Sequence, residues 1–390
     1  MNQNDFVLVC AGEDSGDVLG EFVVQEICAH GLIVKGTGGP RMQMAGLAPL
    51  ADYEELPVSG FGDVLPRYFR LKKIFKILKR ALLDEHCVAF IAIDYPGFNM
   101  KLMQVAFAKW KILPKVPALY VAPPQTWAWK SSRAKKLQRS QLAVLFDFEK
   151  EFYESKGCRV QQIQHPFAVF AKQNPQTNLE NFLLKPQLLL FPGSRSAQAL
   201  RNLPFFLDIA RLWHNQNTQK SVKIVAPRES LKIEIEAFVD DYCNGTLPNW
   251  LSILVAPADA KKRFEIYSGA TLALSAPGTV TLELALAEVP LVVSTVPDNM
   301  TYFIGSHFVK TKNFALPSII MGEDLFPEYI FSLKKITENE TVEIVATALS
   351  EAHLQPAKET ASRLQERMAG MSLQELALEF LCQFVQGDTK

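Results

Sequence analysis

The sequence predicts an α/β protein with two doubly wound, Rossmann-like domains that face each other across a cleft, followed by a helical C-terminal end. Short apolar runs alternate with helical patterns, the alternation begins afresh at Leu188, and no strand pattern remains after about residue 341. Such alternation is typical of parallel sheets with helices on both faces. These sheets bind ligands at the carboxyl ends of their strands, so the informative loops should follow strands directly.

The predicted strands are apolar throughout, as expected of parallel strands that helices cover on both faces. They comprise residues 7–11, 88–93, 118–121, 143–146, 188–191, 222–225, 253–255, 272–274 and 291–293. A polar segment rich in Asn and Gln, residues 171–181, separates the two sets. The predicted domains are therefore residues 1–170 and 171–340, with residues 341–390 as a helical segment.

The composition excludes several classes of protein. The 390 residues carry 41 basic and 41 acidic side chains, so no overall positive field recruits nucleic acid. Six cysteines without a C-x-x-C pair, and no His, Asp or Glu set with metal-ligand spacing, indicate a protein of the reducing cytoplasm without a metal or other cofactor. The first residues lack a signal-peptide pattern, and no apolar run approaches the roughly 18 residues of a membrane span. A membrane role would have to be peripheral.

The first loop, AGEDSGD at residues 11–17, is glycine-rich but acidic. Its carboxylates would repel nucleotide phosphates and suit hydroxyl recognition or base chemistry on a polyhydroxylated ligand. Candidate residues are Gly12, Glu13, Ser15, Gly16 and Asp17. The alternative is that the carboxylates are solvated turn residues or caps, with Ser15 or Asp17 capping the following helix.

The second loop, IDYPGFN at residues 93–99, places Asp94 directly after an apolar strand, with Asn99 five residues later. A carboxylate at the end of a strand in a cleft is a candidate general base. The alternative is an Asp turn, which is common before Pro-Gly.

Two loops of the second domain have the pattern of anion sites. FPGSR at residues 191–195 and PGTVTLE at residues 277–283 each join a strand to a helix, whose first N–H groups bind phosphate. Neither continues as a P-loop. The candidate diphosphate ligands are Gly193, Ser194, Arg195, Gly278, Thr279 and Thr281. Glu283 is expected in the first helical turn, where its carboxylate accepts hydrogen bonds from the two hydroxyls of a ribose. The alternative is that its charge only complements the helix dipole. At residues 191–195 the alternative is an ordinary turn without a bound anion.

Residues 65–83 predict a basic amphipathic helix with an apolar stripe at positions 71, 74, 75, 78 and 82. Its candidate membrane contacts are Arg67, Phe69, Arg70, Lys72, Lys73, Phe75 and Lys76. An interfacial helix on anionic lipid fits this pattern. A core helix with a basic solvated face is the alternative, and RNA binding is a third, although stacking aromatic residues are sparse.

Two weaker signals remain. Trp127 and Trp129 of the WAW segment could stack on a sugar or base, although buried side chains are the alternative. His165 is expected to have a structural role.

Ten segments in register closely resemble the lipid-A-disaccharide synthase family, glycosyltransferases of the GT-B fold, over roughly residues 5–330. They are AGEDSGD, GTGGPRMQMAG at 36–46, SGFGDVLPR at 59–67, IDYPGFN, WAWK, FDFEKEFYE at 146–154, QHPF, FPGSR, PGTVTLELAL and NFALPSIIMG at 313–322. The resemblance implies an inverting transfer from UDP-2,3-diacylglucosamine to the 6-hydroxyl of 2,3-diacylglucosamine 1-phosphate (lipid X), without a metal.

The resemblance also assigns roles. Asp94 would deprotonate the acceptor hydroxyl, and Glu13 would orient sugar hydroxyls or be the base instead. Residues 193–195, Gly278 and Thr279 would hold the diphosphate, with Arg195 stabilising the departing UDP, and Glu283 would bind ribose. The basic helix would seat the enzyme on the inner face of the inner membrane, and the C-terminal part could form a homodimer.

The chain departs from the family pattern at four positions. Gly97 replaces a second Asp, which leaves Asp94 as the base of that loop. Asp147, Pro277 and Ser318 also differ from the usual residues, and these changes are expected to alter affinity or acyl preference.

Two other hypotheses remain. Another sugar-nucleotide enzyme of the same fold, a UDP-N-acetylglucosamine 2-epimerase or a peptidoglycan-precursor transferase, would need no basic amphipathic helix, and the latter should carry a more glycine-rich first loop. A non-catalytic membrane-surface protein would not need Asp94, Arg195 and Glu283 together.

Overall fold

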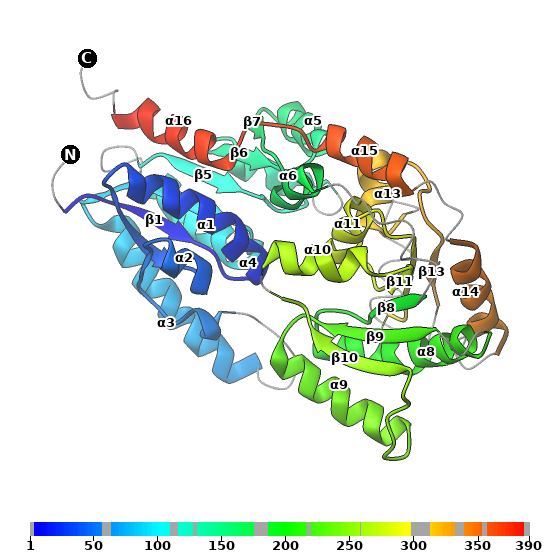
Figure 1. Cartoon of the computed structure of the whole chain (residues 1–390). Helices are drawn as coiled ribbons and strands as arrows, with labels where there is room; N and C mark the ends of the chain where they lie inside the picture. Colours follow the sequence, from blue (N-terminus) through cyan, green and yellow to red (C-terminus); the bar gives the residue numbers. More distant parts are fainter. Residues whose placement is uncertain are drawn as a thin grey trace. The chain divides into compact units, whose positions relative to one another are not determined.

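The computed structural model describes residues 4–56, 64–109, 116–127, 131–174, 186–216, 220–257, 259–297, 313–331, 339–352 and 357–385. By its internal contacts the chain forms two compact units. Unit 1 consists of Met1–His165 and Met368–Lys390, and unit 2 is Pro166–Arg367. Each has its own parallel sheet (Figure 1).

The sheet of unit 1 has seven strands in the order β3-β2-β1-β4-β5-β6-β7, with parallel pairing throughout. The strands are β1 (Phe6–Cys10), β2 (Ile33–Thr37), β3 (Ala48–Pro49), β4 (Cys87–Ile93), β5 (Ala118–Val121), β6 (Gln141–Val144) and β7 (Arg159–Gln162). Because side chains alternate along a strand, Val7 and Val9 enter one core and Leu8 and Cys10 the other.

Helices cover both faces of this sheet. One core is closed by α1 (Asp14–Ala29), α2 (Pro40–Met44) and α16 (Leu373–Val385). The opposite core is closed by α3 (Val64–Leu83), α4 (Pro96–Lys109), α5 (Asp147–Ser155) and the 3-10 helices η1 (Tyr53–Glu55) and η2 (Ser131–Leu137). This doubly wound layering places the loops that follow β1 and β4 at the same edge of the sheet.

The chain crosses between the units twice. It leaves unit 1 after His165 to form α6 (Pro166–Gln173), and returns at Met368 to form α16. On its return, Met371 forms a parallel bridge with Ile163 beyond the end of β7, and α16 packs beside α1 (Figure 1). The helical end is therefore divided, because α14 (Asn339–Ala352) and α15 (Ala357–Arg367) belong to unit 2.

The sheet of unit 2 has six parallel strands in the order β10-β9-β8-β11-β12-β13. They are β8 (Gln187–Phe191), β9 (Ser221–Ala226), β10 (Leu251–Val255), β11 (Leu272–Ser275), β12 (Leu291–Thr295) and β13 (Glu328–Ile330). The helices α8 (Ser196–Asn215), α9 (Glu229–Tyr242) and α14 share one core with it. A second group packs together around α11, and comprises α6, α10 (Ala260–Ser268), α11 (Thr279–Leu286), α13 (Leu316–Met321) and α15.

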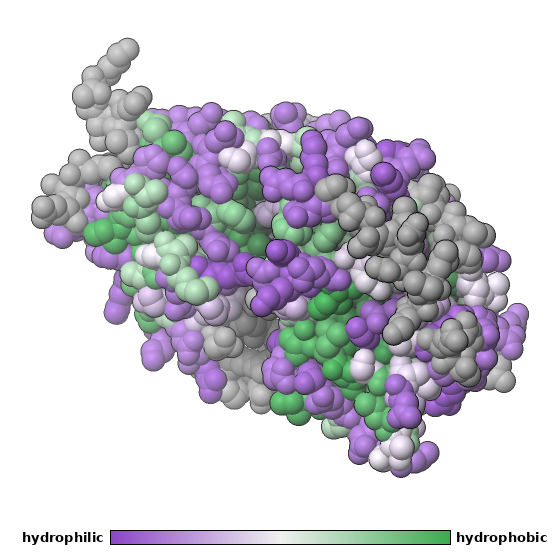
Figure 2. Space-filling view, in the orientation of Figure 1, coloured by the Kyte–Doolittle hydropathy of each residue, from purple (hydrophilic) through white to green (hydrophobic). Residues whose placement is uncertain are grey.

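The surface is largely polar in the view of Figure 2, with hydrophobic residues gathered over β9 and the edge strand β10. Among the helices of the described residues, none has the length and apolar character needed to cross a bilayer. The predicted doubly wound α/β fold is confirmed, and each of the nine predicted strands overlaps an observed one. The strands β2, β3, β7 and β13 were not predicted.

The returning helix α16 should be essential to unit 1. Phe380 is 1% exposed within the core formed with α1, so Phe380→Ala should lower the free energy of unfolding by about 3–5 kcal/mol. Hydrogen exchange should show the loss of protection in α1 and β1 and little change in β8. The exposed Gln383 on the same helix supplies the control Gln383→Ala, and equal protection in both variants would contradict the prediction.

Candidate active site

The strand order of unit 1 reverses between β1 and β4, so the loops after these two strands flank one crevice of the sheet edge. The acidic loop follows β1, and the IDYPGFN loop follows β4. The structure brings them into contact, because the Ser15 hydroxyl donates to Asp94 Oδ2 at 2.9 Å. Two predicted site residues from separate loops are thus joined.

The backbone at Asp94 is strained. Asp94 and Tyr95 both lie in the left-handed region, with φ of 47° and 50°, a conformation costly for residues with a side chain. Tertiary hydrogen bonds hold it: Asp94 N–H donates to Val121 O at 2.9 Å, and the Tyr120 hydroxyl donates to Asp94 O at 3.0 Å. The chain therefore leaves β4 abruptly and presents the Asp94 carboxylate at the sheet edge.

Asn99 also fixes this turn. Its Nδ2 donates to the carbonyl oxygens of Cys10, Ile93 and Asp94, at 3.1, 3.1 and 2.8 Å. Asn99 is only 1% exposed, so its side chain braces the ends of β1 and β4. The structure thus gives Asn99 a positioning role, and its contact with the acceptor stays a prediction.

The Asp94 carboxylate is suited to accept a proton. Burial raises its pKa above the ordinary value, and the bonds from the Ser15 hydroxyl and from Tyr95 N–H (2.8 Å to Oδ1) lower it in part. The residue is half-buried, so the carboxylate retains access to a ligand. A raised pKa makes the ionised carboxylate a stronger base.

The other residues of the acidic loop have different surroundings. Glu13 is exposed at the N-cap of α1, although its side chain does not cap the helix. Gly12 lies against the Tyr95 ring, because a Cβ there would be 2.4 Å from Tyr95 Cδ1. Ser15 and Asp17 both lie inside α1, so the expectation that one of them caps this helix is wrong.

Asp17 caps a different helix. Its carboxylate accepts the backbone N–H groups of Arg41 and Met42, both at 3.1 Å, at the start of α2. A Cβ on Gly39 would lie 2.5 Å from Asp17 Oδ2, so a glycine is required there. Asp17 is 5% exposed, and it anchors the GGPRM segment rather than facing the Asp94 crevice.

The strand order of unit 2 reverses between β8 and β11, and the two predicted anion loops follow these strands. Gly193 has φ of +135°, which favours glycine. Ser194 and Arg195 are exposed, and Arg228 Nη1 donates to Ser194 O at 2.8 Å. Within the described part of the chain the Arg195 guanidinium makes no ion pair, so it is available to an anion.

The threonines of the second anion loop differ. Thr279 begins α11 and is exposed, as is Gly278 before it. Thr281 is buried, and its hydroxyl donates to Gly278 O at 2.7 Å. Since a threonine has one hydroxyl proton, Thr281 does not offer it to phosphate in this conformation.

Glu283 lies in the second turn of α11, not in the first as expected, so the dipole explanation for it fails. Its carboxylate accepts Nε and Nη2 of Arg263, both at 3.2 Å, and the Tyr267 hydroxyl at 3.0 Å. The side chains of Arg263 and Glu283 are 15% and 16% exposed. The pair holds the carboxylate in one orientation while leaving an edge open to a ligand.

The predicted basic helix exists as α3, but its apolar stripe is not free. Ile74, Leu78 and Leu82 are buried in the core of unit 1, with Leu71 and Phe75 packed against it. The apolar stripe is therefore part of the core, as in the alternative of a core helix with a basic solvated face, and the predicted membrane contact Phe75 packs against that core. Phe69 is 63% exposed, and the exposed cations of the helix are Arg70, Lys72, Lys73, Lys76, Lys79 and Arg80. The side chain of Arg67 lies outside the described residues.

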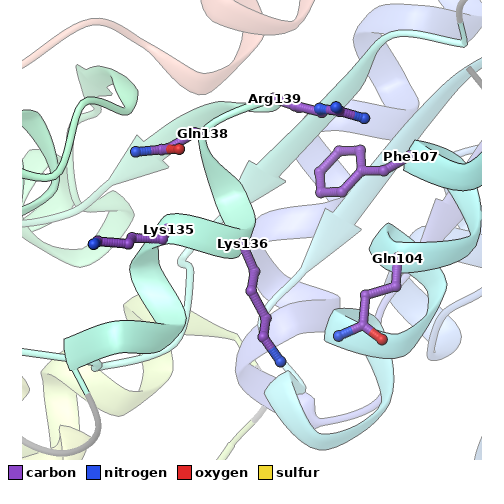
Figure 3. A pocket seen from close by; sticks show the side chains of 6 residues that line it. All are labelled: Gln104, Phe107, Lys135, Lys136, Gln138 and Arg139. Carbon is purple, nitrogen blue, oxygen red and sulfur yellow. The ribbon is translucent and has the colours of Figure 1, made fainter.

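A hollow of about 390 Å³ lies on the same face of the unit 1 sheet as α3, between α4 and the residues around η2 (Figure 3). It is lined by Gln104, Phe107, Lys135, Lys136, Gln138 and Arg139. Three of these six are basic and none is acidic. Because Gln138 and Arg139 immediately precede β6, the hollow lies towards the amino ends of the strands, away from Asp94.

Several residues that position the site were not predicted. Asn202 is fully buried, donates to Pro192 O at 2.7 Å and accepts from Val296 N–H at 2.8 Å, so it joins the loops after β8 and β12. An asparagine in an apolar helical pattern was the available signal. Arg228, Arg263 and Tyr120 give no local signal, because their partners are distant in sequence.

The Ser15–Asp94 bond yields a pH prediction. The hydrogen bond from the Ser15 hydroxyl stabilises the ionised form of Asp94 and so lowers its pKa. Ser15→Ala should therefore raise the Asp94 pKa further. The acidic limb of the kcat/KM profile should then move to higher pH, with little change on the alkaline side. Ser155→Ala, on an exposed serine at the C-terminal end of α5, is the control, and a shift to lower pH or none would contradict the assignment of Asp94 as the base.

Comparison with known proteins identifies the family. The model of the lipid-A-disaccharide synthetase family matches residues 7–380. The lipid-A-disaccharide synthase of Geobacter metallireducens is 32% identical over 336 residues, 84% of each chain, and that of Trichlorobacter lovleyi is 31% identical over 376 residues, 93% of each.

Solved structures are similar in fold. The S. aureus MnaA–UDP structure has a TM-score of 0.60 at 10% identity, covering 98% of this chain and 97% of its own. A glycosyltransferase from Rickettsia africae has a TM-score of 0.53 at 11% identity, covering 98% and 100%. These similarities show a GT-B-like fold with two parallel sheets. With the family match over most of its length, the chain belongs to the lipid-A-disaccharide synthase family, the glycosyltransferases of lipid A biosynthesis.

Proposed function

We propose that the chain transfers the sugar of UDP-2,3-diacylglucosamine to the 6-hydroxyl of lipid X, giving lipid A disaccharide 1-phosphate and UDP. The observation that carries the proposal is the Asp94 carboxylate, which lies on a strained turn and accepts a hydrogen bond from Ser15. The turn lies where the strand order of the unit 1 sheet reverses. This is the place in a doubly wound sheet where a ligand binds.

In the proposed reaction Asp94 takes the proton of the acceptor hydroxyl as its oxygen attacks the anomeric carbon of the donor. The bond from that carbon to the diphosphate oxygen breaks, and UDP departs with the electron pair. A single in-line displacement inverts the configuration. Glu13, exposed in the adjacent loop, orients acceptor hydroxyls and remains the alternative base.

The donor would bind to unit 2. Arg195 and Ser194, with the N–H groups at the start of α8, offer positive charge to the diphosphate. Thr279 and Gly278 add donors at the start of α11. Glu283, oriented by Arg263, accepts from the ribose hydroxyls. Charge that develops on the leaving UDP is stabilised by Arg195.

We also propose that unit 1 rests peripherally on the inner face of the inner membrane, where diacylated substrates reside. The exposed cations of α3 each contribute about 1 kcal/mol near an anionic surface, and Phe69 supplies an apolar contact. The basic hollow beyond α4 extends this charge on the same face of the sheet. A homodimer through the C-terminal part stays a prediction.

The assignment of the base is tested with Asp94→Asn. The product assay mixes both substrates in detergent with EDTA and measures disaccharide phosphate and UDP by mass spectrometry. We expect kcat to fall about 10²- to 10⁴-fold, the typical contribution of a general base, while UDP binding changes little. Asp84→Asn, an exposed aspartate before β4, is the matched control. If Asp94→Asn keeps full turnover and Glu13→Gln is inactive, Glu13 and not Asp94 is the general base.

Membrane association is tested by charge reversal. Lys72→Glu, Lys73→Glu and Lys76→Glu together should release the protein from vesicles that contain anionic lipid, as measured by co-sedimentation. The control places the same charge change on unit 2, at the exposed residues Lys261, Lys262 and Lys358. Equal release by both triple variants, or by neither, would show that the basic face of α3 makes no specific contact with anionic lipid.

A further inference from the structure

A buried carboxylate on α5 has no part in the proposed mechanism. Glu149 is 4% exposed, and burial raises its pKa to about 7. It is the third residue of α5, and its carboxylate accepts the backbone N–H groups of Leu145 and Phe146, which directly precede the helix. Its Oε1 also accepts the indole N–H of Trp127 at 3.2 Å. Burying a carboxyl group costs free energy that an apolar residue at this position would avoid. The bond from Glu149 to Trp127 is therefore a candidate reason for the carboxyl group to be there.

The bond fixes a loop at the carboxyl edge of the sheet. Trp127 ends the described part of the PPQTW segment that follows β5, the strand next to β4. The same segment is held by Tyr153, one helical turn beyond Glu149. The Thr126 hydroxyl donates to the Tyr153 hydroxyl at 3.2 Å, and that hydroxyl donates in turn to Pro124 O. One face of α5 therefore clamps this segment at two points.

The clamp is connected to the turn that carries Asp94. Tyr120 on β5 donates its hydroxyl to Asp94 O at 3.0 Å. Tyr120 and Tyr153 are both fully buried in the same core of unit 1. The Trp127 loop and the candidate base thus share one hydrogen-bonded and packed region at the ends of neighbouring strands.

Trp127 presents an aromatic surface. It is half-buried, and it packs edge-to-face on Phe148 with ring centroids 4.9 Å apart at 86°. Phe148 is half-buried as well and stacks on Phe146 at 5.7 Å. The Glu149 carboxylate removes the rotational freedom of the indole, because it binds the only N–H of that ring. A rigid, partly exposed ring of this kind binds a ligand at low entropic cost.

We propose that Glu149 is a positioning residue that fixes Trp127 as an aromatic wall for the pyranose ring of the acceptor, beside Asp94. The inference rests on the proposed function. The hydroxyl that Asp94 deprotonates must lie within hydrogen-bond distance of the carboxylate, so the group nearest to Asp94 is the sugar and not the acyl chains. The C–H groups on one face of a pyranose carry partial positive charge, which the negative face of an indole attracts.

The test measures KM for lipid X and for the UDP-sugar separately. Trp127→Ala should raise the acceptor KM about tenfold, as expected for the loss of one aromatic contact, with the donor KM within about twofold of the parent. Trp127→Phe keeps a ring but loses the N–H and should show a smaller rise. Glu149→Ala should raise the acceptor KM, and Glu149→Gln should restore part of it, because an amide oxygen still accepts the indole N–H.

The control is Glu154→Gln, the same chemical change on the solvent side of α5, which should alter neither KM. A purely structural role predicts equal changes in both KM values together with a lower melting temperature, and that result would overturn the proposal. So would an unchanged acceptor KM in Trp127→Ala. If the effect of Trp127→Ala disappears with an acceptor that carries shortened acyl chains, the ring contacts a chain and the sugar wall is wrong. Absence of turnover in the parent protein would instead refute the proposed function.

Discussion

The candidate active site of unit 1 depends on the side chain of Asn99. One amide group bonds three main-chain carbonyls, of Cys10, Ile93 and Asp94, and so joins the ends of the two strands between which the strand order reverses. The left-handed conformations of Asp94 and Tyr95 persist only because such bonds over-determine the turn. Strain is thereby stored where a carboxylate must be presented in one orientation. The remaining features of the crevice follow, since the Ser15 bond, the packing of Gly12 on Tyr95 and the Tyr120 bond all require this turn.

The loops at the point where the strand order reverses carry opposite charges in the two units. In unit 1 the loops carry carboxylates, which suit a neutral hydroxyl that must lose a proton. In unit 2 the loops carry glycines, hydroxyls and, at a helix start, Arg195, which makes no ion pair with any residue that the structure describes. These groups suit a diphosphate. Among the described residues, two carboxylates lie near these loops. Glu283 is paired with Arg263 through two hydrogen bonds, which offset its charge, and Glu234 accepts a hydrogen bond from the Ser196 hydroxyl at the start of α8. Under the proposed function, this separation accounts for the acidic character of the glycine-rich loop in unit 1.

Most of the central strands could be predicted from the sequence, whereas the edge strands β3, β7 and β13 could not. Core strands such as β4 and β8 are apolar on both faces, and this signal is local. By contrast β7 reads RVQQ, since an edge strand meets solvent and needs fewer apolar residues. The inner strand β2 contains Lys35 and Gly36, which interrupt its apolar pattern. The return of α16 to unit 1 depends on a bridge between Ile163 and Met371, and no local pattern encodes a pairing over that separation. Asp94 could be predicted because it ends a strand, whereas the partners of Asp17, Asn99 and Thr281 depend on the directions of their side chains.

The carboxylates of unit 1 show why position along a strand does not by itself assign a role. Asp17 and Asp94 both have pKa values raised by burial. Asp17, however, receives backbone N–H groups at the start of α2 and is 5% exposed, so no ligand can deliver a proton to it. Asp94 receives one hydroxyl and one N–H, and it retains solvent access and free lone pairs. A base needs a raised pKa and an open lone pair together, and of the two only Asp94 has both. Asp17 and Asp94 therefore share the direction of their pKa shifts and differ in access, which is why Asp94 is the candidate base.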